Sequence, residues 1–97
     1  MLNSKQKRQL KGLAMKEAAL YQIGKNEISD NTLEMLDKAL TARELIKISV
    51  LNSVLSPINQ IALDLSSALK ADVVEEIGHV IVLYRQNNEK PVIKLVK

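Results

Sequence analysis

Four basic residues near the amino terminus, and a glycine-led turn that follows them, have the chemistry to bind phosphate. The four are Lys5, Arg8, Lys11 and Lys16. The turn is Gly24-Lys25-Asn26-Glu27, where backbone N–H groups can approach an anion closely and Lys25 adds long-range attraction. Arg85, near the other end of the chain, is a further candidate contact. These residue types predict a partner that carries many negative charges.

The distribution of charge along the chain supports this prediction. The net charge is only +3, but residues 1–23 hold five basic residues and one acidic residue. Residues 24–78 hold five basic and nine acidic residues, and residues 79–97 hold four basic and one acidic. Two basic ends around an acidic middle favour a polyanion that is bound by the terminal segments.

Catalytic and metal-binding patterns are missing from the sequence. The chain has no cysteine and one histidine, His79, whereas a metal site needs three or four ligands that converge. We find no phosphate-binding Walker loop, no dinucleotide fingerprint and no nucleophile elbow. Two tyrosines are too few for a module that stacks successive unpaired bases. We therefore expect a protein that is not an enzyme and has no cofactor or metal.

The length and the apolar pattern limit the architecture. We expect residues 1–97 to form a single domain, which is large enough for one core but too small for a deep enzyme pocket beside it. The longest apolar run, residues 80–84, is too short to span a membrane, and the amino terminus lacks the apolar centre of a signal peptide. We expect a cytoplasmic protein with no membrane contact.

Three helices are predicted from apolar residues at helical spacing and from cap residues. The first begins with Ser4 as its cap and runs to about Lys16, with its basic residues opposite an apolar stripe. The second has Ser29 as its cap and ends near Arg43. The third has Ser56 as its cap and a proline in its first position.

The strands are predicted at residues 19–23, at 44–51, where Ile46, Ile48 and Val50 share a face, and at the β-branched runs 73–77 and 80–84. A weaker run at 92–96 suggests a final strand. The order is then α-β-α-β-α-β-β. Strands that alternate with helices predict an α+β fold, with a mixed sheet and helices packed on it.

Four segments resemble the YhbY family of bacterial RNA-binding proteins, the stand-alone form of the CRM (chloroplast RNA splicing and ribosome maturation) domain. They are residues 2–14, 22–26, 44–48 and 77–85, and they occur in the family's order. The resemblance implies a two-layer fold like the carboxy-terminal domain of bacterial initiation factor three. It also implies association with precursors of the large ribosomal subunit and a Gly-x-x-Gly loop that contacts RNA.

The predicted partner is therefore structured ribosomal RNA, and not DNA. The predicted contacts are Lys5, Arg8, Lys11, Lys16, Gly24, Lys25, Asn26 and Arg85. Glu27 stands where the family's loop has its second glycine, and a carboxylate beside a phosphate repels it. This departure leaves open an alternative, a protein-interaction adaptor with weakened RNA binding. The oligomeric state is not predicted.

Overall fold

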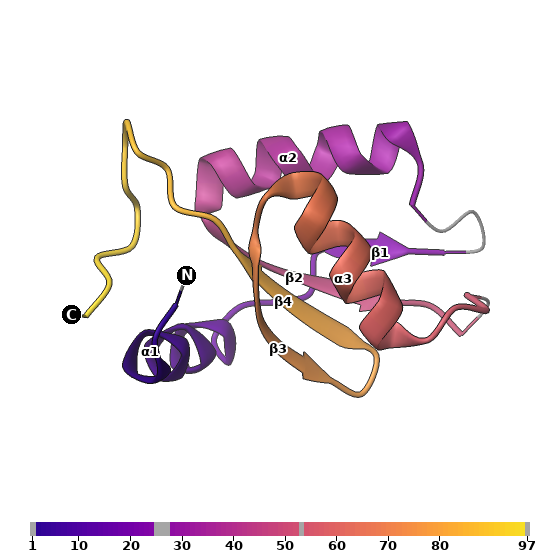
Figure 1. Cartoon of the computed structure of the whole chain (residues 1–97), viewed down its shortest axis with the longest axis horizontal. Coiled ribbons are helices and arrows are strands. Elements are labelled where there is room, and N and C mark those ends of the chain that lie inside the picture. The colour runs from indigo at the N-terminus through magenta and orange to yellow at the C-terminus, as the bar shows by residue number, and fades with distance from the viewer. Residues whose placement is uncertain (1, 25–27, 53, 97) are drawn as a thin grey trace.

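Three helices and four strands make up the computed structural model, which describes residues 2–24, 28–52 and 54–96. The elements follow one another as α1 (Ser4–Ala14), β1 (Tyr21–Ile23), α2 (Asp30–Arg43), β2 (Leu45–Val50), α3 (Ile58–Leu69), β3 (Asp72–Ile77) and β4 (Val80–Tyr84) (Figure 1). The predicted order of elements is confirmed.

The four strands form one mixed sheet in the order β1-β2-β4-β3. Strand β1 runs parallel to β2, whereas β4 is antiparallel to both of its neighbours. The hairpin from β3 to β4 turns at Gly78, whose φ of 55° is a conformation that glycine adopts without strain. The predicted α+β class with a mixed sheet is confirmed.

Each face of the sheet has its own hydrophobic core. Ile46, Ile48 and Val50 alternate along β2 and pack with α2 and α3 on one face. Leu45, the residue before Ile46, points to the other face and packs there with Leu10 of α1. Helix α1 therefore adds a partial layer on the face opposite α2 and α3, beyond the two layers that the resemblance implied (Figure 1).

The helix caps correct two predictions and confirm a third. Asn3, not Ser4, caps α1, in a capping box whose other half is the side chain of Gln6. Ser29 caps α2 as predicted, accepting from the backbone N–H of Thr32. Pro57 is itself the cap residue of α3, with ψ 146°, so the helix begins at Ile58 and not with proline in its first position after a Ser56 cap. Sequence alone places the start of these helices to within one residue, because neighbouring residues can each serve as the cap.

The ends of several elements also differ from the prediction. Helix α1 stops at Ala14, so Lys16 follows the helix, and β1 starts two residues later than predicted. The run 92–96 is not a strand. Its apolar residues Ile93 and Leu95 pack against the α1 core instead, which explains why the run looked like a buried strand.

Candidate nucleic-acid interface

Helix α1 separates its basic and apolar side chains onto opposite faces. Leu10 and Ala14 are buried against the sheet, while Lys5, Arg8 and Lys11 are exposed. The helix contains no acidic residue to oppose them. The predicted basic face of α1 is thus a cationic surface on the side of the helix that points away from the sheet.

Lys7 belongs to the same surface, although the sequence analysis left it out of the binding set. It is exposed, and at about 100° per residue it lies between Lys11 and the buried Ala14 around the helix. The signal that could have identified it is its place among four basic residues in a helix without acidic ones.

The polypeptide leaves the basic face directly after α1. Lys16 is exposed in the turn that follows the helix, where its backbone N–H donates to the Leu13 carbonyl at 3.1 Å. On β2, Lys47 donates from Nζ to the Glu17 carbonyl at 3.3 Å and so fastens the connection from α1 to β1. Lys16 is thus an exposed basic residue just beyond the end of α1.

Gly24 is the one residue of the glycine-led turn that the structure describes. Figure 1 shows α1 toward one end of the long axis of the molecule and β1 pointing to the other end. Gly24, directly after β1, is half-buried, and a Cβ added there would meet the Leu51 side chain at 3.3 Å. The predicted contacts Lys25 and Asn26, and Glu27 with them, lie outside the described residues. Gly24 itself therefore lies away from the basic face of α1.

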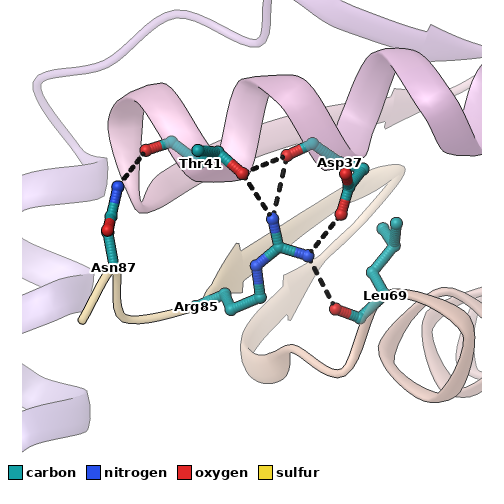
Figure 2. Close-up of polar contacts among 5 residues, drawn as sticks. All are labelled: Asp37, Thr41, Leu69, Arg85 and Asn87. Carbon is teal, nitrogen blue, oxygen red and sulfur yellow. Dashed lines mark hydrogen bonds and ion pairs between the residues drawn. The ribbon is translucent and has the colours of Figure 1, made fainter. Parts of the chain in front are cut away.

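Arg85 is held within the protein. Its two terminal nitrogens make four hydrogen bonds, to Asp37 Oδ1 at 2.7 Å and to the carbonyl of Leu69, the carbonyl of Asp37 and the hydroxyl of Thr41, each at 2.9 Å (Figure 2). These bonds use all four N–H groups of the two nitrogens. Arg85 joins the end of β4 to α2 and α3, on the face opposite α1, and this geometry leaves it a structural role.

Charge is sorted across the sheet as well as along the chain. The helices α2 and α3 hold four acidic residues and two basic ones, on the face opposite α1: Asp30, Glu34, Asp37 and Asp64 against Lys38 and Arg43. Helix α1 is therefore purely cationic, whereas α2 and α3 carry charges of both signs. A polyanion would be attracted to one side of the molecule.

Comparison with known protein families gives a match over residues 2–85, to the family described as the CRS1/YhbY (CRM) domain. This chain belongs to the CRM domain family. The matched range covers every helix and strand of the fold, and ends at Arg85. The predicted family is confirmed.

Two curated relatives and one solved structure are similar over nearly their whole lengths. The probable RNA-binding protein YqeI of Bacillus subtilis is 39% identical over 95 residues, 98% of this chain and 99% of its own. An RNA-binding protein of Haemophilus influenzae is 35% identical over 88 residues, 91% of this chain and 89% of its own. The solution structure of the hypothetical protein SAV1595 from Staphylococcus aureus superposes with a TM-score of 0.83 at 40% identity, covering 99% of this chain and all of that one.

Neither a cluster of metal ligands nor a helix able to span a membrane occurs in the part of this CRM domain that the structure describes. There, no three carboxylate or imidazole groups come close enough to hold a metal ion. None of the described helices is long and apolar enough to cross a membrane.

Proposed function

We propose that this protein binds structured RNA through the basic face of α1, as a non-catalytic cytoplasmic factor that associates with ribosomal RNA or precursors of the large ribosomal subunit. The observation that carries the proposal is the one-sided charge of α1: four exposed basic residues, no acidic residue, and the opposite face buried in the core. The names of the similar proteins from B. subtilis and H. influenzae support RNA as the partner.

Binding of this kind works by neutralising phosphates. Each lysine or arginine that contacts the RNA backbone releases condensed counterions, and this release drives association. Such contacts carry little sequence information, so shape and charge select the RNA. If about four phosphates are neutralised, the affinity falls roughly 100-fold between 50 and 200 mM salt.

The first experiment measures RNA affinity by fluorescence anisotropy with a labelled RNA hairpin over this salt range. Replacing Lys5, Arg8 and Lys11 together with glutamine should abolish most of the affinity and flatten the salt dependence. The melting temperature should hardly change, because exposed substitutions usually alter stability by less than about 0.5 kcal/mol. Normal RNA binding by the folded triple variant would refute the proposal.

A matched pair of single substitutions tests the location. Lys11→Gln and Lys38→Gln each remove one exposed lysine, but Lys38 lies on α2 across the sheet and pairs with Glu34 at 3.3 Å. Only Lys11→Gln should weaken RNA binding, by the several-fold expected for one phosphate contact. Equal effects would show that net charge matters and not the α1 surface.

The ribosomal part of the proposal needs a cellular measurement. In a sucrose gradient of a cell extract, the wild-type protein should run with precursors of the large subunit and the triple variant near the top. If the wild-type protein binds RNA hairpins but stays at the top of the gradient, RNA binding stands and the ribosomal role fails.

Two exposed leucines favour a second candidate function, an adaptor that binds another protein. In the connection from β2 to α3, Leu55 is 96% and Leu51 is 40% exposed, and a protein partner could cover such side chains. The adaptor function predicts that the α1 triple variant still runs with ribosomal particles, whereas Leu51→Ser with Leu55→Ser does not. The opposite pattern supports RNA binding.

A further inference from the structure

The last eleven described residues, 86–96, form neither helix nor strand, yet side chains fix them at both ends. Glu44 accepts three hydrogen bonds from backbone N–H groups of the first eight of these residues. One carboxylate oxygen accepts from Asn87 at 2.6 Å, and the other accepts from Val92 at 2.7 Å and Ile93 at 2.6 Å. Glu44 is fully buried. A buried carboxylate is costly unless it is hydrogen-bonded, and here the tail backbone supplies the donors.

The position of Glu44 in the fold directs its carboxylate to the tail. It ends α2 with a φ of 64°, a conformation that side-chain-bearing residues rarely adopt. Its own N–H donates to the Leu40 carbonyl, and its carbonyl accepts from the N–H of Arg85, the last residue before the tail. One residue therefore closes the helix, pairs with the end of β4 and holds the segment that follows.

Helix α1 binds the far part of the tail. The Gln9 side chain donates to the Lys94 carbonyl at 2.8 Å and accepts from the Val96 N–H at 2.9 Å, and Gln6 donates to the Val96 carbonyl at 2.9 Å. Beneath these bonds, Ile93 and Leu95 pack on the α1 core. Figure 1 shows the two ends of the chain at the same end of the molecule, so the basic termini meet in space.

This path places Lys94 beside α1, whereas Lys90 lies nearer the end of α2, where its backbone N–H donates to Asn87 and the Asn87 amide donates to the Thr41 carbonyl. Gln9 and Lys5 are one helical turn apart on the same side of α1, and the tail runs past Gln9 at Lys94. The side chains of Lys90 and Lys94 are exposed, with one acidic neighbour, Glu89. Hydrogen bonds to side chains elsewhere in the fold, and not a strand, thus set where these charges lie.

We propose that the tail is a second part of the RNA-contacting surface, in which Lys94 binds a phosphate of the same RNA as α1 and Glu44, which holds the neighbouring Ile93, acts as the positioning residue. The inference rests on the proposed function. The tail lies beyond residue 85, where the match to the family model ends, but the similar proteins of B. subtilis and S. aureus match 98% and 99% of this chain and therefore include it. Fixing the tail before binding avoids the entropy cost of ordering it on RNA.

The lysine is tested first, by anisotropy with the labelled RNA hairpin. In the full chain, Lys94→Gln should lower the affinity several-fold in about 0.1 M salt and reduce the salt slope by about one. The matched control is Lys38→Gln, and only the tail substitution should have an effect. An unchanged salt slope in Lys94→Gln overturns the proposal.

The positioning role is tested by releasing the tail without touching its lysines. Glu44→Gly removes the carboxylate while glycine accepts the positive φ, and Gln9→Ala removes two tail contacts at a half-buried helix position. Each should weaken RNA binding. Adding Lys94→Gln to either variant should then cost less than it does in the wild-type chain, because a released tail contributes little. Full additivity overturns the positioning role, and Gln9→Ala decides it if Glu44→Gly fails to fold.

The results for the α1 and tail variants distinguish a failure of the tail inference from a failure of the proposed RNA binding. If the α1 triple variant loses RNA while the tail variants bind normally, RNA binding stands and the tail inference is wrong. If wild-type protein shows no salt-dependent RNA binding, the proposed function itself is wrong and the inference falls with it.

Discussion

The carboxylate of Asp37 lies 2.7 Å from the guanidinium of Arg85, although 48 positions separate the two residues in the chain. The pair ties the end of β4 to the middle of α2, and further bonds from Arg85 reach the carbonyl of Leu69 at the end of α3 (Figure 2). Two helices and a strand thus meet at one side chain. Arg85, which the sequence predicted to contact phosphate, is thus an internal cross-link of the fold.

Replacing Arg85 should therefore affect stability and not RNA binding. Arg85→Gln leaves backbone carbonyls and Asp37 without their donors, so we expect a loss of about 1 to 3 kcal/mol, or roughly 4 to 8 °C in melting temperature per kcal/mol. Glu34→Gln, which breaks the exposed pair with Lys38, is the control and should cost less than about 0.5 kcal/mol. Thermal unfolding measures both, and a reduced salt slope of RNA binding in folded Arg85→Gln would return Arg85 to the interface.

Asn3 and Ser4 should respond differently to alanine. Asn3→Ala removes the acceptor for the Gln6 N–H, at 2.8 Å, and should lower the free energy of unfolding by about 0.5 to 2 kcal/mol. Ser4→Ala, inside the helix, should be neutral or slightly stabilising, since alanine is the better helix former. Urea unfolding of both variants checks the cap, and the reverse order would restore Ser4 as the cap residue.

The hydroxyl of Tyr84 is buried and finds no hydrogen-bond partner among the described residues. Tyr84→Phe should therefore leave stability unchanged or raise it slightly, because the substitution removes a polar group that has lost its water without gaining a bond. A loss above about 1 kcal/mol in urea unfolding would mean that the hydroxyl is satisfied in solution.

The same tyrosine predicts a dependence of stability on alkaline pH. Burial, and then the negative charges of Glu44 and Asp72, raise the pKa of Tyr84 above its usual value of 10.0. The folded state thus keeps the proton more tightly than the unfolded state does. The contribution of the protonated Tyr84 hydroxyl to the free energy of unfolding is fully present below pH 10 and is lost as the pH rises from there through the pKa of Tyr84 in the folded state. Between about pH 8 and pH 11, the melting temperature should fall less steeply with pH for Tyr84→Phe than for wild type. Identical slopes would contradict this prediction.

The glycine-led turn offers a prediction from sequence alone. If Gly24 to Glu27 contacts phosphate, Glu27→Gly should raise RNA affinity, by at most about tenfold and less in high salt, and Lys25→Ala should lower it. Anisotropy with the same hairpin measures both. If neither substitution changes the affinity while the α1 triple variant loses it, the turn serves only to reverse the chain and RNA binding rests on the other surface.

Local spacing in the sequence determined most of the elements, because helix and strand periods are properties of neighbouring residues. The alternation of Ile46, Ile48 and Val50 predicted a strand face, and Ser29 predicted the start of α2; the structure confirms both. The basic face of α1 was equally visible, since residues one turn apart share a side. Family membership followed from motifs in order along most of the chain.

Only the tertiary structure decided what distant residues do to one another. Glu44 looked like the first residue of a strand, yet the end of α2 turns its carboxylate into the core, where a segment more than 40 positions away supplies its hydrogen bonds. The run 92–96 had the composition of a strand, but the described sheet gives it no partner, and it packs on α1 instead. Such pairings depend on the order of strands and the faces that helices cover, which no local pattern encodes.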